Sequence, residues 1–338
     1  MTEQIEASRV EAALLSPPEG AIAPRVTPDV LVLVSLTTAL LATSFSAIFI
    51  RVSEVDLGPN GTVFNRFLIF FLAFGAGRLL SRRAEVVDAT EIARERLETK
   101  QAYGWRELSL LFSVGLVSSI SLVLWAFSLA ETTVAKSILL NNFTPVFTTL
   151  GGWFFFGKRF DRRFLIGMCV AIVGVLTIAY EDLSLAHGGH WYGDLLALLS
   201  AVFLGSYYLL VEQLRDRLEA TTILLWRCGV GCLLLIPIVC WQEGGQFFAH
   251  SWLGWMAAIG LGLICEGMGQ RLLAACLDRL SAGFVSLFLL LEPLIGALLA
   301  WTIFGERLSG GDGIAFAIVL YGIYIAQTSS SAAKAVGD

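Results

Sequence analysis

The second half of this chain repeats the first half at a constant shift of 148 residues. Three stretches align in this one register: Thr144-Pro145 with Glu292-Pro293, Phe156-Gly157-Lys158-Arg159 with Phe304-Gly305-Glu306-Arg307, and Gly174 with Gly322. Each half also contains five apolar spans. Because five is odd, the two repeats must cross a bilayer in opposite directions. Inverted repeats of this kind build many secondary transporters and place the substrate site between the halves, near the membrane midplane.

The composition indicates that the bilayer is the solvent of this chain. Of its 338 residues, 56% are hydrophobic and only 15% are charged, and the mean hydropathy is +0.75. A soluble domain of this length does not need so much apolar surface. A helix needs about 20 apolar residues to cross the hydrocarbon. Ten such spans are expected, at residues 30–50, 60–80, 107–130, 133–156, 162–180, 191–213, 219–241, 251–275, 281–304 and 310–328. The sequence therefore predicts an all-α integral membrane protein with ten transmembrane helices in two inverted five-helix repeats.

The positions of Lys and Arg predict the orientation in the membrane. If the N-terminus is cytoplasmic, the inward segments hold seventeen Lys and Arg residues and the outward loops hold only Arg51 and Arg307. This is a strong positive-inside bias. We therefore expect a multi-pass protein of the cell (plasma or inner) membrane with both termini in the cytoplasm. Its parts are an N-terminal tail (1–29), a first repeat (30–180) with a cytoplasmic loop at about 81–106, a second repeat (190–328) and a C-terminal tail (329–338).

The sequence carries no sign of soluble-type catalysis, of a metal site or of a cofactor. It has no Walker loop, no His-Glu-x-x-His motif and no serine elbow. The six cysteines all fall in apolar spans, where they are expected to be small packing residues. His187 and His190 lie in an outward glycine loop and supply only two potential metal ligands. We therefore expect no catalytic residues, and the protein is not expected to be an enzyme.

Ionisable groups inside the hydrocarbon are costly, so each one is a functional candidate. Glu292 precedes Pro293 in mid-span, and this proline frees backbone carbonyls one turn back, beside the carboxylate. Such a site suits a substrate ammonium or a proton, although a hydrogen-bonded Glu that fixes a kink is the structural alternative. Asn141 and Asn142 stand one turn before Thr144-Pro145, at the inverted counterpart of this site. Their amides suit a substrate carboxylate, or they hydrogen-bond a neighbouring helix.

Glu266 and Gln270 lie one helical turn apart and share a face of the eighth span. In the first repeat the position of Glu266 is taken by Ser118, so the acid belongs to the second half only. An acid without a symmetric partner favours a role in specificity or coupling. The alternative is a buried ion pair with Arg227 or Arg271, although Arg271 is five residues further on and faces elsewhere.

Arg66 and Arg227 lie about two turns inside the second span of their respective halves. We expect these arginines to bind carbonyls or to snorkel to the interface, with a gate or an anion clamp as the alternative. Together with Arg271 they are the candidate gating or structural charges. Two aromatic residues, Trp125 and Tyr207, are added to the substrate-binding candidates because their polar tips need partners when buried.

These residues resemble the EamA family of the drug/metabolite transporter superfamily over about residues 30–328. The resemblance is carried by Arg66-Phe67 in the second span, by Leu291-Glu292-Pro293 in the ninth and by the Phe304–Arg307 exit. It implies ten helices, two cytoplasmic termini and a substrate cavity lined by spans 1, 3, 4, 6, 8 and 9. Six candidates lie on such spans: Glu292, Asn141, Asn142, Trp125, Glu266 and Tyr207. Arg66 and Arg227 do not.

We therefore expect a secondary transporter, most consistent with an exporter, of a small polar metabolite such as an amino acid or a related amphoteric solute. Its partners would be this substrate and the lipid bilayer, with proton coupling through Glu266 or Glu292 or simple facilitated efflux, and no nucleic acid. A monomer or a homodimer is compatible with the sequence. An uptake permease for a sugar, a nucleotide or an organic acid is the alternative, and a membrane enzyme acting on lipids is a remote one.

Overall fold

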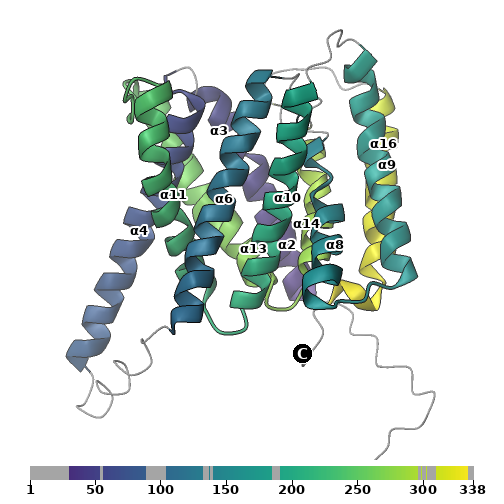
Figure 1. Ribbon diagram of the computed structural model, residues 1–338, viewed down its shortest axis with the longest axis horizontal. Coiled ribbons are helices and arrows are strands. Elements are labelled where there is room, and N and C mark those ends of the chain that lie inside the picture. The colour runs from purple at the N-terminus through teal and green to yellow at the C-terminus, as the bar shows by residue number, and fades with distance from the viewer. Residues whose placement is uncertain are drawn as a thin grey trace, which may run out of the picture.

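The computed structural model describes residues 30–53, 56–88, 104–131, 140–184, 191–295 and 310–333, together with Ser137, Leu298 and Thr302. Within these residues all regular structure is helical, apart from one isolated β-bridge between Leu280 and Ala333. The helices form one bundle in which most axes run side by side (Figure 1). The N-terminal tail, most of the loop at 81–106, and His187 and His190 lie outside the described residues.

The first half of the chain contributes α2 (Val30–Ser44), α3 (Ser46–Ser53), α4 (Pro59–Asp88), α6 (Trp105–Glu131), α8 (Thr144–Phe156) and α9 (Arg162–Ser184). The second half contributes α10 (Trp191–Leu214), α11 (Ala220–Gln242), α12 (Trp252–Gly260), the π-helix η1 (Leu261–Gln270), α13 (Arg271–Cys276), α14 (Ala282–Phe288), the 3₁₀ turn η2 (Leu289–Leu291) and α16 (Gly310–Gln327). A last 3₁₀ turn, η3, covers Ser330–Ala332.

Six helical stretches among the described residues are long and apolar enough to cross a membrane: Val30–Ile50, Pro59–Leu80, Trp105–Trp125, Trp191–Leu214, Ala220–Gln242 and Trp252–Cys276. Two shorter apolar helices, Ala282–Ile295 and Ala317–Gln327, fall within the ninth and tenth expected spans. The all-helical class expected from the sequence is confirmed for the described residues.

The fourth and ninth expected spans both interrupt their helices just before the Pro of the repeated motif. In the fourth span, a turn at Asn142-Phe143 precedes α8, with Pro145 in the first turn of that helix. In the ninth span, the 3₁₀ turn η2 precedes Glu292-Pro293. A proline cannot donate to the carbonyl one turn back, so the regular α pattern cannot be kept at either place. The two interruptions fall at equivalent positions of the sequence repeat.

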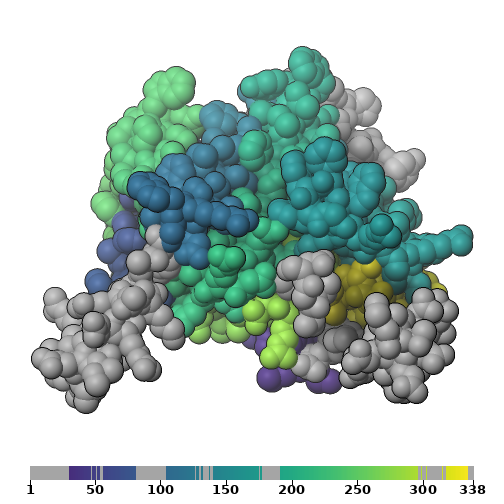
Figure 2. Space-filling model, turned by 60° about the horizontal axis from the view of Figure 1, so that its bottom comes forward, coloured from purple at the N-terminus to yellow at the C-terminus, as the bar shows by residue number. Residues whose placement is uncertain are grey.

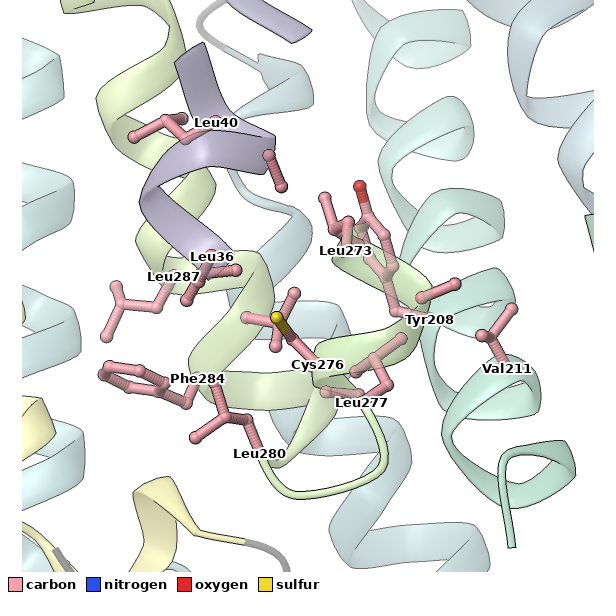
Figure 3. Close-up of a cluster of buried hydrophobic side chains, with 14 of the residues drawn as sticks. Leu36, Leu40, Tyr208, Val211, Leu273, Cys276, Leu277, Leu280, Phe284 and Leu287 are labelled. Carbon is pink, nitrogen blue, oxygen red and sulfur yellow. The ribbon is translucent and has the colours of Figure 1, made fainter. Parts of the chain in front are cut away.

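The core of the bundle is shared by helices from both halves. α9 packs along α16, α6 along α10, α4 along α11, α8 against α14, and α2 against η1 and α13. In the largest cluster of buried side chains, Tyr208 of α10 points toward Leu273 of α13, and Leu36 of α2 lies near Leu287 of α14 (Figure 3). The elements that carry the site are therefore fixed by contacts between the two halves.

The helices α9 and α16 approach closely because each presents a glycine to the other. A Cβ at Gly322 would lie 2.5 Å from the backbone N of Ala171, and one at Gly174 would lie 2.7 Å from a side-chain carbon of Val319. Only glycine permits this separation of the two backbones. The contact is reciprocal, because Ala171 and Val319 are themselves related by the repeat shift.

One end of the bundle, here called the Arg-rich end, gathers nine of the described basic residues. They are Arg78, Arg106, Lys158, Arg159, Arg162, Arg163, Arg215, Arg217 and Arg279. Figure 2 brings this end forward and shows segments of both halves adjoining there. At the opposite end the described residues include a single arginine, Arg51. Charge is thus distributed along the bundle axis as the sequence analysis expected.

Candidate functional site

The site is built around Glu266, which lies in the π-helix η1 and is completely buried. Glycines let this segment approach its neighbours closely. A Cβ at Gly262 would lie 2.6 Å from Ile69 of α4, and one at Gly269 would lie 2.8 Å from Thr43 of α2. In the first half the equivalent segment of α6 is regular α-helix. Single turns of π-helix are frequent at functional sites, and here the longer π segment contains an acid that the first half lacks.

Two arginines from the second helices of the two halves bind opposite oxygens of the Glu266 carboxylate. Arg66 donates from Nε to Oε2 at 2.8 Å, and Arg227 donates from Nη1 to Oε1. Arg66 lies seven residues after the first residue of α4, and Arg227 lies seven residues after the first residue of α11. Two arginines in corresponding places therefore share a single carboxylate.

Arg227 is held on every side that the structure describes. Its Nε donates to Ser118 Oγ of α6 at 2.7 Å. The guanidinium lies over the rings of Phe67 and Tyr207, with 5.2 and 4.8 Å between its Cζ and the ring centroids. Ser118 is the repeat counterpart of Glu266, so one guanidinium joins the two equivalent positions of the inverted halves. These contacts make Arg227 part of the framework of the site.

Arg66 is the more accessible of the two arginines. Its side chain keeps 14% of its surface exposed, against 6% for Arg227. Besides its bond to Glu266, it donates one long hydrogen bond within the described residues, 3.4 Å from Nη1 to Ser46 Oγ. Donor positions of its guanidinium thus remain for a further acceptor.

Glu292 is a second carboxylate near Arg66. The two charges interact electrostatically, yet no ion pair joins them among the described residues. Glu292 is half-buried, and its carboxylate also interacts electrostatically with Tyr208. A guanidinium with free donor positions and a carboxylate thus lie within electrostatic range of each other without an ion pair, and such a pair suits a solute carrying both charges.

Asn141 belongs to a second polar group, one helical turn along α6 from Ser118. Ser121 of α6 and Ser200 of α10 each donate to the other's backbone carbonyl, at 3.0 and 2.9 Å. Ser200 Oγ also contacts Asn141 Oδ1 at 3.4 Å. The hydrogen bond to a neighbouring helix that the sequence analysis gave as an alternative for Asn141 is therefore present. Asn142 is half-buried beside it in the turn.

The remaining candidates differ in their surroundings. Trp125 Nε1 and Gln270 Oε1 are buried without a hydrogen-bond partner among the described residues. Buried polar atoms are nearly always paired in folded proteins. Trp125 Nε1 could therefore donate to a bound solute, and Gln270 Oε1 could accept from one. Arg271 lies over the ring of Phe74, 5.6 Å from its centroid, and is exposed. It is not part of the Glu266 cluster.

The structure corrects one expectation from the sequence. Arg66 and Arg227 do not bind carbonyls or snorkel to the interface, because both point into the bundle and bind Glu266. The physical reason is that the desolvated carboxylate is the strongest available partner for each guanidinium. The ion pair between Glu266 and Arg227, which the sequence gave as an alternative, is present. Among the described residues, Glu266 does not pair with Arg271.

A second buried acid, Glu212 of α10, was not among the site residues predicted from the sequence. Its carboxylate pairs with Lys158 Nζ at 2.6 Å and accepts from the backbone N–H of Ala282 at 3.2 Å. These bonds tie the ends of α8, α10 and α14 together at the Arg-rich end. Glu212 lies just inside the end of its apolar span, and the sequence alone predicts that an acid at this position lies at the membrane interface. Its burial depends on the neighbouring helix ends, which no local pattern specifies.

The arrangement has the chemistry of a binding site. No group of three His, Cys, Asp or Glu side chains that suits a metal ion occurs in the part of the chain that the structure describes. The cluster instead offers fixed cations, a carboxylate and unpaired polar atoms, contributed by helices from both halves.

Comparisons with known proteins give a consistent result. The model of the EamA-like transporter family matches residues 30–180 and 191–328. Relatives include an uncharacterized transporter, YxxF, of Bacillus subtilis (26% identical over 54% of this chain and 59% of that protein) and the pseudopaline exporter of Pseudomonas aeruginosa (23% over 57% and 65%). A probable amino-acid metabolite efflux pump of Salmonella typhimurium is 24% identical over 53% of this chain and 62% of that protein.

The chain thus spans less than two thirds of the length of these three relatives. Among solved structures, one titled only as the crystal structure of a protein matches with a TM-score of 0.69 at 16% identity. The match covers 88% of this chain and 96% of the other. At that level of identity the match supports the fold alone.

Proposed function

The chain belongs to the EamA-like transporter family, and from this premise we propose that it exports a small amphoteric metabolite, such as an amino acid or a close relative, by alternating access. The chain is a multi-pass membrane protein, and its named relatives are transporters and not enzymes. The observation that carries the proposal is that Arg66, which binds the buried Glu266, also lies within electrostatic range of Glu292 without an ion pair between them.

The proposed architecture is ten transmembrane helices in two inverted repeats. The packing supports it, because exchanging the halves maps several contacts onto one another. The contact of α6 with α10 maps onto that of the α12–α13 span with α2, and the contact of α6 with α11 maps onto that of the same span with α4. The pairs α4 with α11, α8 with α14 and α9 with α16 map onto themselves. Rocking of such halves about a site between them is the usual basis of alternating access.

The proposed orientation places the Arg-rich end and both termini in the cytoplasm, and the proposed membrane is the plasma or inner membrane. The positive-inside rule supports this orientation, since most of the described basic residues outside the Glu266 cluster gather at one end. The ion pair between Lys158 and Glu212 would then close the cytoplasmic side, leaving the site to open toward the outside.

The proposed substrate places its carboxylate on Arg66 and its ammonium on Glu292. Arg66 has unused donors and partial exposure, whereas both oxygens of Glu266 are already bound by arginines. A zwitterion between Arg66 and Glu292 would neutralise both groups at once, and this lowers the cost of removing the solute's charges from water. Trp125 Nε1 and Gln270 Oε1 would supply further polar contacts.

Glu292 is the better of the two candidate proton carriers. A carboxylate that takes up a proton loses its ion-pair partners during part of the cycle. If Glu266 were protonated, the buried charges of Arg66 and Arg227 would be left without a counter-ion. Glu292 has no ion-pair partner among the described residues. Proton uptake by Glu292 would release the substrate ammonium, which couples export to proton entry.

The test is counterflow and efflux in proteoliposomes with three labelled probes: a neutral amino acid, a dicarboxylate and a sugar, each with and without a pH gradient. We expect the amino acid to move and the gradient to drive it. Arg66→Lys and Glu292→Gln should each abolish this flux. Arg271→Gln serves as the matched control, because Arg271 lies outside the cluster, and should leave the flux unchanged. Movement of only the sugar or the dicarboxylate would refute the amphoteric substrate while leaving the transporter family intact.

A further inference from the structure

A groove of about 460 Å³ opens between α4 and α11, away from the Glu266 cluster. Its walls are almost entirely apolar, and the residues that matter for the argument are Phe71, Gly75, Arg78 and Leu79 of α4 with Thr222 and Trp226 of α11. The volume lies within the range of small-molecule sites. Figure 1 shows why the groove exists, because α4 leans away from the bundle toward its C-terminal end.

The groove faces the hydrocarbon and not the interior of the bundle. Phe71, Leu72 and Leu79 are 41%, 58% and 65% exposed. Both walls belong to stretches that are apolar enough to cross a membrane. The natural occupant of an outward apolar groove at this depth is an acyl chain, which would replace the van der Waals contacts that the two helices do not make with each other.

The end of the groove nearest the Arg-rich end is cationic. Arg78 hydrogen-bonds Thr222 Oγ1 and makes a long contact of 3.8 Å with Glu219, a residue whose side chain is 80% exposed. Such an exposed pair contributes little and is easily exchanged. The 23-residue helix α11 begins beside Arg78, at Ala220, and its N-terminal dipole also favours an anion.

Two further basic residues follow Arg78 in the sequence. Arg82 and Arg83 follow Arg78 by one turn of α4. Basic residues at the end of a membrane helix attract anionic headgroups. An apolar groove that ends in a cationic site matches the two chemical parts of an anionic phospholipid, whereas a neutral lipid would use only the apolar part.

We propose that this groove is a binding site for one anionic phospholipid, with its phosphate on Arg78 and the first turn of α11 and one acyl chain along Phe71, Gly75 and Trp226. The lipid would brace α4 against α11, the two helices that carry Arg66 and Arg227. The proposal does not rest on the identity of the transported substrate.

Two glycines of α4 provide a matched pair of variants. A Cβ at Gly75 would meet only Leu225, at an ordinary 3.8 Å, while a Cβ at Gly77 would have nothing within 4 Å. Gly75→Leu therefore fills the groove without a clash, and Gly77→Leu makes the same chemical change outside it. Arg78→Gln removes the cation and keeps a hydrogen-bonding side chain.

The experiment is native mass spectrometry and thermal unfolding of the full chain in detergent, titrated with phosphatidylglycerol or phosphatidylcholine. We expect one phosphatidylglycerol to be retained and to raise the Tm, with weaker binding of phosphatidylcholine. Arg78→Gln should weaken the binding of phosphatidylglycerol by about fivefold. It should also remove the preference for phosphatidylglycerol over phosphatidylcholine. Gly75→Leu should abolish retention of both lipids, and Gly77→Leu should bind as the wild type does.

Three results would overturn the proposal. The first is equal binding by the Gly75→Leu and Gly77→Leu variants. The second is a Tm increase of the same size with inorganic phosphate alone, which would make this an anion site without a lipid. The third is a dimer that Gly75→Leu dissociates, which would make the groove an interface between copies. If Arg78→Gln does not fold, the glycine pair and the two lipids still decide the question.

Discussion

Ser118 and Glu266 hold the same place in the two halves of the chain and are joined by one guanidinium, that of Arg227. The serine accepts from Nε and the carboxylate accepts from Nη1. A polar link between equivalent positions places the charge cluster where the two halves meet. Any relative movement of the halves must strain or rearrange these bonds, so the cluster is suited to sense which state the protein occupies.

Loss of the Glu266 charge should destabilise the fold, and loss of the Glu292 charge should not. Glu266→Gln leaves Arg66 and Arg227 buried without their counter-ion. Removing one partner of a buried pair costs about 3–5 kcal/mol. We therefore expect a clear fall in the Tm of the purified protein for Glu266→Gln, and a near-normal Tm with lost transport for Glu292→Gln. An unchanged Tm for Glu266→Gln would show that the cluster is hydrated and exchangeable.

The ion pair between Lys158 and Glu212 should control opening at the Arg-rich end. Because Glu212 is buried and also accepts from Ala282, Lys158→Met would leave a buried carboxylate short of its cation and favour an open, hydrated state. Cys276 is a buried free thiol at the end of α13, next to the turn at residues 277–279 at this end of the bundle. With the exposed Cys169 and Cys240 replaced by serine, maleimide labelling of Cys276 should accelerate in the Lys158→Met variant.

The exchange Lys158→Glu with Glu212→Lys is the control for this prediction. It keeps both charges and the contact while it reverses their places, so labelling should return toward the wild-type rate. If Lys158→Met leaves the labelling rate of Cys276 unchanged, the pair is a static contact and does not close this end.

The sequence was sufficient to predict features that depend on local chemistry or on periodicity. Pro293 removes a backbone donor wherever it stands, so the interruption at Leu289–Leu291 follows from the sequence alone. The apolar spans and the gathering of basic residues at one end were predictable for the same kind of reason. The pairing of Arg66 with Glu266 was not, because it joins residues 200 positions apart. It depends on how α4 and η1 are rotated about their axes, and nearly uniform apolar helices leave that rotation undetermined.

The close contact between α9 and α16 should not tolerate a larger residue at Gly174 or at Gly322. Gly322→Ala would bring a methyl group within 2.5 Å of the Ala171 backbone, so the helices must separate. Overpacking of this kind costs about 1–3 kcal/mol. We expect Gly322→Ala and Gly174→Ala each to lower the Tm in detergent, while Gly77→Ala, with open space around it, should leave the Tm unchanged. Equal Tm values for all three variants would mean that α9 and α16 are not tightly packed in solution.

Asp56 should make stability at the end opposite the Arg-rich end depend on pH. It lies between α3 and α4, outside the spans, and its carboxylate accepts from the backbone N–H of Ser251 at 2.6 Å and of His250 at 2.9 Å. These bonds, that from Ser251 above all, lower the pKa of Asp56 below its ordinary value of 3.8. The stabilisation is therefore complete above the ordinary pKa and is lost as the pH falls through the lowered pKa of the folded protein.

Asp56→Asn is the variant that isolates this contribution, because the amide keeps the shape and an oxygen acceptor but cannot titrate. At pH 7 the Tm of the wild type should exceed that of Asp56→Asn. The gap should stay constant down to about pH 4 and then close as the wild-type carboxylate is protonated. A gap that instead widens on acidification would mean that the protonated form of Asp56 is preferred in the folded state. The two backbone N–H groups at the start of α12 would then not be what holds Asp56.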